Sequence, residues 1–558
     1  MEAGADGFMS EAKRIVGQAW LAVPRSVLLC CLWLATWRIY NIWCDRLRNP
    51  RRLPFPPGPK GYPIVGNALD VPAESWLKFT EWAVYGDVVG LSMMGERAVV
   101  LNTWGSISAL LNKRGAIYSS RKPRLLFSKY GGWDFSLTFL PHGENFLLQR
   151  RFYHQIIGST AVKSFHEIIL KNARTLALQI SQTPLQFQYL TRLSAINLNI
   201  ALIFCILNRG SSSIIADTVA MIYGFEVNLE NAEWVKRLDF CLDSLEALSK
   251  VPHATDFFPI LANLPAWVWG NKLNHLLDKL KASTNKLGQE PYNLVKDQVF
   301  SGTAPHCLVA DLIESNRTSG GDVKHEREIM AVAAVSMIAG VDTTVSAIDT
   351  FILAMMLYPE AQKKAQEELD AVLTDIRLPT FEDRESTPYL SAVLKETLRW
   401  KPVAPLTIPH SVIQDDEYNG MFIPKDTRIF ANIWNMVYNS DDYPEPFEFI
   451  PERFLDPSSK APQLRKDILD PEELLFGFGR RVCPGRAFAT ASLWINMATL
   501  LAIFEISLPV DPEGNPIKPD LDYRIDGIAY HPKPYKCHIK PRLQGVSRLS
   551  ALREALSQ

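Results

Sequence analysis

The sequence of 558 residues lacks the features that mark several common functional classes. Its formal net charge is only −1, which argues against a nucleic-acid-binding protein that depends on a strong overall positive field. The eight cysteines are scattered and none belongs to a CxxC pair, so zinc-ribbon and thioredoxin-like sites are excluded. Single cysteines at such spacings favour a reducing compartment over a disulfide framework. No internal repeat is present, and the length suits either several domains or one large helical domain with an N-terminal appendage.

What the sequence does contain is a glycine-rich loop, residues 476–485, that delivers one cysteine to the start of a helix. Gly477 and Gly479 permit a tight turn, and the segment after the loop is rich in good helix formers. Pro484 has no backbone N–H and a suitable φ, so we expect it just inside the start of that helix. The loop therefore predicts a sharply bent backbone that places Cys483 at a helix N-terminus.

This position should change the chemistry of the cysteine. Unpaired backbone N–H groups at a helix N-terminus favour a thiolate over a thiol. Neighbouring guanidinium groups act in the same direction, and they belong to Arg480, Arg481 and Arg486. Such a thiolate could be a nucleophile or a metal ligand, while a lone loop cysteine is most often a small buried hydrophobe. The residues by themselves leave these three alternatives open.

The fixed positions of the loop distinguish between the alternatives. The pattern Phe-x-x-Gly-x-Arg-x-Cys-x-Gly is filled by Phe476, Gly479, Arg481, Cys483 and Gly485, and it resembles the heme-binding signature of the cytochrome P450 family at every fixed position. The resemblance implies the fold of that family, mainly α with a minor β portion, with heme b bound non-covalently and Cys483 as the axial iron ligand. By the same resemblance, Phe476 and Gly485 belong to the cofactor-binding residues. The absence of a CxxCH sequence agrees with non-covalent binding.

A long, mostly apolar segment, residues 326–357, predicts a buried helix with a polar cluster in its middle. Gly340 costs about 1 kcal/mol relative to alanine in such a helix, and Asp342 and Thr343 add to that cost, so the cluster should be either satisfied or functional. Thr343 could simply donate its hydroxyl to the carbonyl four residues earlier. The resemblance to the cytochrome P450 family instead implies that Thr343 hydrogen-bonds iron-bound oxygen and that Asp342 relays protons to it.

Heme propionates require basic partners, and the resemblance points to three of them. Arg481, His410 and Arg150 occupy positions that are commonly basic in the family. The sequence departs from the family at Phe146, where a tryptophan is usual, so one hydrogen bond to a propionate is expected to be missing. Arg121 is expected in the loop over the heme and not among the ligands of the propionates.

The resemblance also implies a buried charged triad. Glu396 and Arg399 are three positions apart and therefore share one helix face, although any solvated helix can carry such a pair. Arg453 follows at the spacing of the family, ahead of the cysteine loop. We expect these three residues to support the fold, because loss of one member would leave the others charged and unpaired.

The N-terminal part predicts a membrane anchor. Ala19 to Trp37 is almost entirely apolar and is long enough to cross a bilayer, and the basic residues after it should remain on the cytoplasmic side. A cleaved signal peptide and an interfacial helix are the alternatives, and Arg25 weakens a full span. The expected organisation is an anchor in residues 1–45, a basic and proline-rich hinge in 46–67, a heme-thiolate catalytic domain in 68–545 and a frayed amphipathic tail in 546–558.

Secondary structure within the catalytic domain follows from periodicity. Alternating apolar residues predict strands in 88–101 and 422–430, and strands are also expected in 530–539. Most of the segment from 146 to 400 has the helical period. The expected domain is therefore mainly helical, with small sheets.

The function that the resemblance implies is a monooxygenase that inserts one atom of O2 into a lipophilic small molecule and releases the other as water. No phosphate-binding glycine loop and no flavin domain is present, so electrons should come from an NADPH-dependent flavoprotein reductase. Residues that could form a basic docking face for this reductase are Arg150, Arg151, Lys401, Arg480 and Arg486. The expected location is the endoplasmic reticulum membrane, with a single span and a cytosolic catalytic domain.

Within the family, the sequence resembles fungal microsomal members that tailor terpenoid or polyketide secondary metabolites, for example in residues 415–424. Two other functions stay open. A heme-thiolate isomerase or dehydratase would need no external electrons, and a non-enzymatic sensor of heme ligands would need no proton relay. The complete motif of Asp342 and Thr343 favours the monooxygenase.

Overall fold

The computed structural model describes most of the chain outside its N-terminus. The described residues are 46–63, 65–125, 128, 130–204, 233–250, 271–304, 307–373, 376–459, 462–526 and 529–557, with Leu32, Thr36, Tyr40 and Trp43. The predicted membrane anchor in residues 1–45 lies almost wholly outside these residues. The chain divides into two compact units: unit 1 comprises residues 1–56 and 414–425, and unit 2 comprises residues 57–413 and 426–558.

Unit 1 contains a short hairpin of β4 (Asp416–Tyr418) and β5 (Met421–Ile423). Asn419 and Gly420 join the two strands with φ of 48° and 74°, the left-handed conformation that a two-residue hairpin turn requires. Arg48 forms an ion pair with Asp415, and further along the hairpin Arg51 pairs with Glu417. Two residues of the basic hinge are therefore engaged within this unit.

Unit 2 is mainly helical. Its helices are α3 (Ser75–Glu81), α4 (Trp104–Ile107), α5 (Gly115–Tyr118), α6 (Glu144–Ile157), α7 (His166–Gln182), α8 (Phe187–Phe204), α10 (Glu233–Lys250), α12 (Asn271–Phe300), α13 (Leu308–Asn316), α14 (Glu326–Leu357), α15 (Pro359–Val372), α16 (Pro388–Trp400), α17 (Ile433–Val437), α18 (Pro471–Leu475), α19 (Arg486–Ile503) and α20 (Leu543–Ser557). The predicted helix over 326–357 is confirmed at both ends by α14.

The strands of unit 2 form small sheets. The largest has the order β1 (Val88–Met93), β2 (Glu96–Leu101), β6 (Arg428–Ala431) and β3 (His410–Ser411), in which β2 and β6 are parallel and the other pairs antiparallel. Two antiparallel pairs complete the set: β7 (Phe504–Ser507) with β10 (His538–Pro541), and β8 (Tyr523–Asp526) with β9 (Ala529–Pro532).

The predicted strands over 88–101 are confirmed, and the strand structure predicted over 422–430 is confirmed at both ends of that segment. Two strands of different sheets, β5 and β6, occupy this segment. The chain turns between them at Asp426, which has φ of 66°, a left-handed conformation that a strand does not contain.

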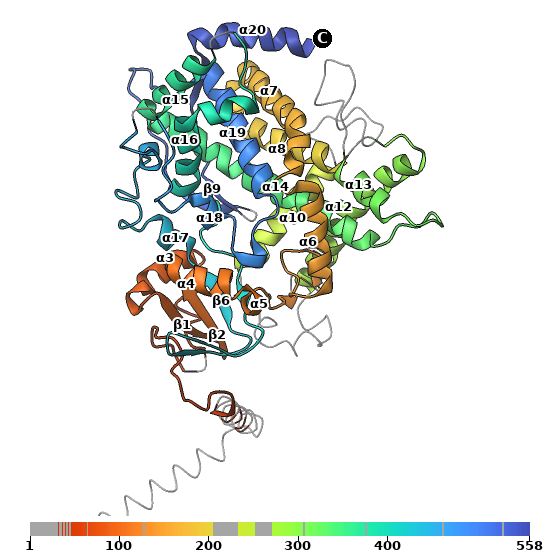
Figure 1. Cartoon of the computed structure of the whole chain (residues 1–558), viewed down its shortest axis with the longest axis vertical. Helices are drawn as coiled ribbons and strands as arrows, with labels where there is room; N and C mark the ends of the chain where they lie inside the picture. The colour runs from red at the N-terminus through yellow and green to blue at the C-terminus, as the bar shows by residue number, and fades with distance from the viewer. Residues whose placement is uncertain are drawn as a thin grey trace, which may run out of the picture. The chain divides into compact units, whose positions relative to one another are not determined.

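The helix α14 forms the centre of unit 2. It packs against α6, α8, α16 and α19, and Figure 1 shows it passing through the middle of the helical part, with the four-stranded sheet at one end of this unit. In the described part of the chain, α14 and α19 are long and apolar enough to cross a membrane, but 67% and 83% of their most apolar windows are buried within the protein. Both are therefore core helices.

The predicted charged triad is confirmed. Arg399 donates from Nε and Nη2 to the two oxygens of Glu396, at 2.7 and 2.8 Å, and Arg453 donates from Nε to Glu396 at 3.2 Å. The remaining donors of Arg399 bind the backbone carbonyls of Val437, Pro446 and Glu448. The triad thus ties α16 to the long segment that leads towards the cysteine loop.

The expectation of a frayed tail over 546–558 is wrong. Helix α20 begins at Leu543, and Leu549 and Leu552 are buried in the main hydrophobic core. Arg548 is 3% exposed and donates to Asp370 at 2.9 Å and to the carbonyl of Ala502 at 3.1 Å. An amphipathic pattern at a chain end does not show whether a receiving surface exists, and here α19 and α15 provide one.

We predict that Arg548→Ala lowers the free energy of unfolding by about 2–3 kcal/mol, because it removes charge-assisted hydrogen bonds from a buried site. Thermal or urea unfolding of the purified protein measures the change. Ser550→Ala, on the exposed side of the same helix, is the matched control and should change stability little. Equal stability of Arg548→Ala and the control would show that the hydrogen bonds of Arg548 do not stabilise the docking of α20.

Candidate active site

The glycine-rich loop bends as predicted. Gly477 and Gly479 have φ of 79° and 53°, and a Cβ atom on Gly479 would lie 2.2 Å from the carbonyl oxygen of Leu111. Only glycine is therefore tolerated at that position without a backbone shift. The backbone N–H of Cys483 donates to the carbonyl of Phe476 at 2.6 Å, which closes the loop on itself.

The cysteine lies just before α19. The helix begins at Arg486 with Gly485 as its N-cap, so the prediction that Pro484 lies inside the helix is wrong. Pro484 precedes the cap and still costs no hydrogen bond there, because residues before a helix have no intrahelical donor to lose. The predicted placement of Cys483 near a helix N-terminus is confirmed.

Cys483 differs from the other cysteines of the described residues. Cys241, Cys307 and Cys537 are buried, whereas Cys483 is exposed. Burial nevertheless raises the pKa of the Cys483 thiol, while the Gly485 N–H and the charges of Arg150 and Arg486 lower it. A side chain that keeps accessible surface deep within the protein lines an internal hollow.

The direction of this pKa shift corrects the sequence-based expectation of a thiolate. In the protein alone, desolvation of Cys483 outweighs the helix N-terminus and the nearby guanidinium groups, so the neutral thiol is favoured. A bound metal ion reverses this balance, since coordination deprotonates a thiol outright. The site is thus suited to a cysteine that becomes a thiolate when it binds a metal ion.

A second feature is a cluster of buried and half-buried basic side chains that have no acidic partner among the described residues. Arg121 is half-buried, but its Nε and Nη1 atoms are buried without a hydrogen-bond partner, and desolvation lowers its pKa to about 9. His410, on β3, donates from Nδ1 to the carbonyl of Tyr118 at 2.8 Å. Burial, followed by the charge of Arg121, lowers the pKa of His410 to about 3.

Arg481 completes this cluster, which we call the basic cluster: Arg121, His410 and Arg481. Its guanidinium donates to the carbonyls of Ser119, Leu137 and Leu140 at 2.6, 3.1 and 2.7 Å. It also lies 3.7 Å from the ring centroid of Phe146, the residue that stands where the family usually has tryptophan. Burial, with the charges of Arg121 and Arg150, lowers the pKa of Arg481 to about 8.

Arg150 has a different environment from the basic cluster. Its Nη1 donates to the carbonyl of Val482 at 2.6 Å, directly beside Cys483. Burial lowers the pKa of Arg150, and the charge of Cys483 opposes that shift. In this structure Arg150 therefore supports the cysteine loop.

Helix α14 has one accessible stripe in an otherwise buried run. Between Ala331 and Met356, the residues that keep accessible surface are Ser336, Ala339, Gly340 and Thr343. Their spacing of three or four positions places them on one face of the helix. We call this face the α14 stripe; it indicates that the hollow within the protein extends along α14.

The two members of the predicted relay lie on different sides of α14. The Thr343 hydroxyl donates to the carbonyl of Ala339 at 2.8 Å and belongs to the α14 stripe. Asp342 is 2% exposed and faces β9, where its Oδ1 lies 3.2 Å from Nε2 of His531. The predicted side-chain bond of Thr343 to the carbonyl four residues earlier is thus confirmed.

Gly340 has a packing role that the sequence did not indicate. A Cβ atom at this position would lie 2.1 Å from Oδ1 of Asn199, a buried residue of α8. The glycine in the middle of α14 therefore allows α8 to approach closely beside the α14 stripe.

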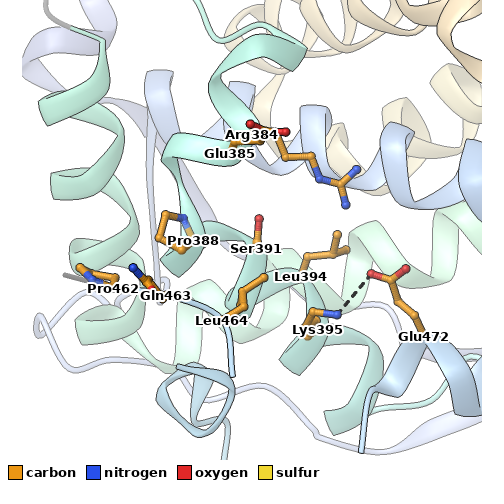
Figure 2. Close-up of a pocket in the computed structure, with 10 residues that line it drawn as sticks. All are labelled: Arg384, Glu385, Pro388, Ser391, Leu394, Lys395, Pro462, Gln463, Leu464 and Glu472. Carbon is orange, nitrogen blue, oxygen red and sulfur yellow. Dashed lines mark ion pairs between the residues drawn. The ribbon is translucent and has the colours of Figure 1, made fainter. Parts of the chain in front are cut away.

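A further pocket of about 480 Å³ lies between α16 and residues 462–464 (Figure 2). Lys395 on its wall is held by Asp470 at 2.5 Å and by Glu472 at 3.6 Å, the ion pair that Figure 2 draws. The guanidinium of Arg384 lies 5.9 Å from the ring of Trp494. None of the predicted site residues lines this pocket.

Comparisons with known proteins agree with the site. The sequence model of the family "Cytochrome P450" matches residues 56–539. The chain is 35% identical over 519 residues to cytochrome P450 monooxygenase COX2 of Coprinopsis cinerea, covering 91% of this chain and 92% of that protein. It is 34% identical over 517 residues to tryptamine 4-monooxygenase of Psilocybe cyanescens, covering 90% and 96%.

The fold has a counterpart among solved structures. A zebrafish cytochrome P450 with abiraterone matches with a TM-score of 0.63 and 23% sequence identity, over 84% of this chain and 99% of that chain. This similarity supports the fold, which is mainly helical with a minor β portion, as predicted.

The chain belongs to the cytochrome P450 family. It is a monooxygenase, and its cofactor is heme b with an axial thiolate.

The residues of the structure fit heme both at its iron and at its propionates. Cys483 offers an accessible sulfur, and the basic cluster offers positive charge without a counter-ion, which two anionic propionates would neutralise. Arg121, which sequence reasoning set aside, fits a propionate best because two of its buried nitrogens have no partner.

We predict that Arg121→Ala weakens heme binding, with heme released roughly tenfold faster, because one charge-assisted contact to a carboxylate is lost. Transfer of heme to apomyoglobin measures the release rate. Arg151→Ala, at an exposed position of α6, is the control and should release heme at the wild-type rate. The apoprotein of Arg121→Ala should unfold at an equal or higher temperature, since it no longer buries an unpaired charge. Unchanged heme release would exclude Arg121 from the propionate site.

A second buried carboxyl on α14 gives a pH prediction. Asp349 accepts a hydrogen bond from Thr191 at 2.9 Å, and burial raises its pKa from 3.8 to about 7. The folded state thus holds a proton that the unfolded chain releases, so this group stabilises the fold fully below pH 4. That stability is lost as the pH rises through about 7.

The wild-type protein should therefore lose on the order of 4 kcal/mol of unfolding free energy through Asp349 between pH 4 and pH 8. The Asp349→Asn variant cannot titrate at this position and should not show that loss. Unfolding temperatures across this pH range measure it, with the exposed Asp441→Asn as the control. Parallel pH profiles of Asp349→Asn and wild type would contradict the raised pKa.

Proposed function

We propose that this protein is a membrane-anchored monooxygenase that oxidises a lipophilic secondary metabolite of the terpenoid or polyketide class. The observation that carries the proposal is the pairing of an accessible Cys483 with an accessible stripe on an otherwise buried α14. A hollow bounded by apolar helices accepts an apolar substrate, because transfer of apolar surface out of water is favourable.

The chain's own residues would act in separate ways around the cofactor. Heme, when bound, supplies the activation of O2. Cys483 would hold its iron through sulfur, and the Gly485 N–H and Arg486 would stabilise the charge on that sulfur. Arg121, His410 and Arg481 would bind the propionates and so set the orientation of the ring.

Protons would reach the hollow from α14. The Thr343 hydroxyl lies on the α14 stripe and would hold a proton at Oγ1, while Asp342 would carry a proton from the side of β9. The buried apolar residues around the stripe exclude bulk water, so that proton delivery is confined to these groups.

Electrons would come from an NADPH-dependent flavoprotein reductase. Of the five basic residues considered for its docking, Arg151, Arg480 and Arg486 are exposed. Arg150 is bound to the cysteine loop, and Lys401 lies 5.1 Å from the ring of Tyr523 with a pKa lowered by burial. A groove of about 850 Å³ runs along α6 beside Arg151 and His154. The lining of this groove has mixed charge, since Glu144 and Glu328 lie there as well as two arginines, so the case for an acidic partner depends on the exposed arginines.

The proposed location is the endoplasmic reticulum membrane, with the catalytic domain in the cytosol. Support comes from the apolar run of Ala19 to Trp37 and from the basic residues that follow it. A lipophilic substrate dissolved in the membrane would be close to such an enzyme.

The substrate class is open to a direct test. One relative at 34% identity is named a tryptamine 4-monooxygenase, so an indole amine belongs in the panel beside terpenoids and polyketides. A fitting substrate displaces water from the ferric iron and shifts the Soret band of the purified protein. A saturable shift with terpenoids or polyketides supports the proposal, whereas a shift with tryptamine alone would overturn the substrate class.

We predict that Thr343→Ala, assayed with the substrate so identified, diverts NADPH consumption from product to peroxide. Loss of a proton-donating group at the site is expected to cost on the order of 10² in the productive rate. Thr344→Ala, at a buried neighbouring position, is the control and should stay coupled. Coupled turnover of Thr343→Ala would count against its role. Product formation without NADPH would favour the isomerase or dehydratase, and binding without turnover would favour the sensor.

A further inference from the structure

The contact between α14 and β9 contains buried polar side chains as well as apolar ones. Asp342, Ser346 and Asp349 are four and three positions apart, so they share one face of α14. Ser346 donates from Oγ to the carbonyl of Tyr530 at 2.8 Å, and Nε2 of His531 lies 3.2 Å from Oδ1 of Asp342. Strand β9 is thus joined to α14 at two successive residues.

His531 and Asp342 form a pair that is closed to solvent. The exposed fractions of the two residues are 8% and 2%. A carboxylate at such a position needs a hydrogen-bond donor, since an unpaired buried charge is strongly destabilising. The Nε2–H of His531 supplies that donor, and β9 holds the imidazole through its own buried residues.

The charged groups that the structure describes near the pair are bound to other partners. Asp349 lies two turns further along α14 and is bonded to Thr191 of α8. Arg192, the next residue of α8, lowers the pKa of Asp349 but forms its ion pair with Asp239. From the segment after β9, Tyr535 donates its hydroxyl to the carbonyl of Asp349 at 2.6 Å.

The pair also explains where the Asp342 carboxylate points. Adjacent residues of a helix do not face each other, so Asp342 and Thr343 diverge. Thr343 lies on the α14 stripe, while Asp342 is turned away towards β9. Its orientation is therefore determined by its partner on the strand and not by the hydroxyl beside it.

We propose that His531 is a positioning residue that holds the Asp342 carboxylate on the β9 side of α14 and thereby controls proton delivery to the α14 stripe. The pairing stands on the structure alone, while its effect on protons rests on the proposed monooxygenase function. Without the imidazole, the carboxylate loses its fixed place and fewer protons arrive in time for complete reduction of oxygen.

The first experiment tests the pairing without any turnover. Thermal unfolding of the holoprotein is measured for His531→Phe, Asp342→Ala and the double variant. His531→Phe should lower Tm by about 3 °C, because it removes a charge-assisted hydrogen bond from a buried carboxylate. In the Asp342→Ala background the same change should cost little, which reveals the coupling. Additive losses would overturn the pairing.

The second experiment reads out proton delivery. With NADPH, a flavoprotein reductase and no substrate, each O2 becomes either peroxide, with two electrons and two protons, or two waters, with four of each. His531→Phe should lower the ratio of water to peroxide by roughly tenfold, the equivalent of one charge-assisted hydrogen bond. His531→Gln keeps a donor on the side chain and should restore most of the ratio.

The matched control is Ser346→Ala, which loosens the same contact between α14 and β9 without touching the pair. A tenfold loss in this control, or no rescue by His531→Gln, would overturn the positioning role. If the wild-type protein lacks a thiolate-type carbon monoxide spectrum or oxidises no NADPH, the proposed function fails. The unfolding cycle then still decides whether His531 and Asp342 are coupled.

Discussion

The structure depends on positive charge that the chain buries and does not neutralise. Arg121, His410 and Arg481 lie together in the interior, and burial lowers the pKa of each. Arg481 is satisfied by backbone carbonyls, but Arg121 has donors without partners. Because an uncompensated buried charge is costly, the bare fold is strained at this place and an anionic cofactor relieves it. Heme binding and folding are therefore linked through the propionate end as well as through the cysteine.

In the triad around Glu396, by contrast, the arginines are neutralised within the protein. There the two arginines find a carboxylate and backbone carbonyls, so that every part of Arg399 is satisfied within the protein. Its contribution is structural, because it joins α16 to the segment before the cysteine loop. The basic cluster is therefore suited to binding the cofactor, whereas the triad stabilises the fold. The hydrogen-bond partners of their arginines distinguish the two sites.

Local features could be predicted from the sequence more readily than contacts between distant segments. The bounds of α14 and the bend at Gly477 and Gly479 follow from periodicity and backbone freedom, which are properties of short stretches. The protonation state of Cys483 did not follow, because desolvation depends on the whole surroundings of the side chain. The docking of α20 was missed for the same reason: an amphipathic pattern does not contain the surface that receives it.

The polar residues of α14 illustrate why a motif is easier to find than its mechanism. The sequence shows Asp342 and Thr343 side by side and suggests that they act on one spot. In the helix they point to different sides, one towards β9 and the other onto the α14 stripe. A residue almost two hundred positions away, His531, is needed to hold the first of them. No local pattern marks that histidine, since a single residue on a short buried strand resembles any other core position. The proposed path of protons thus depends on the contact between α14 and β9, and on neither segment alone.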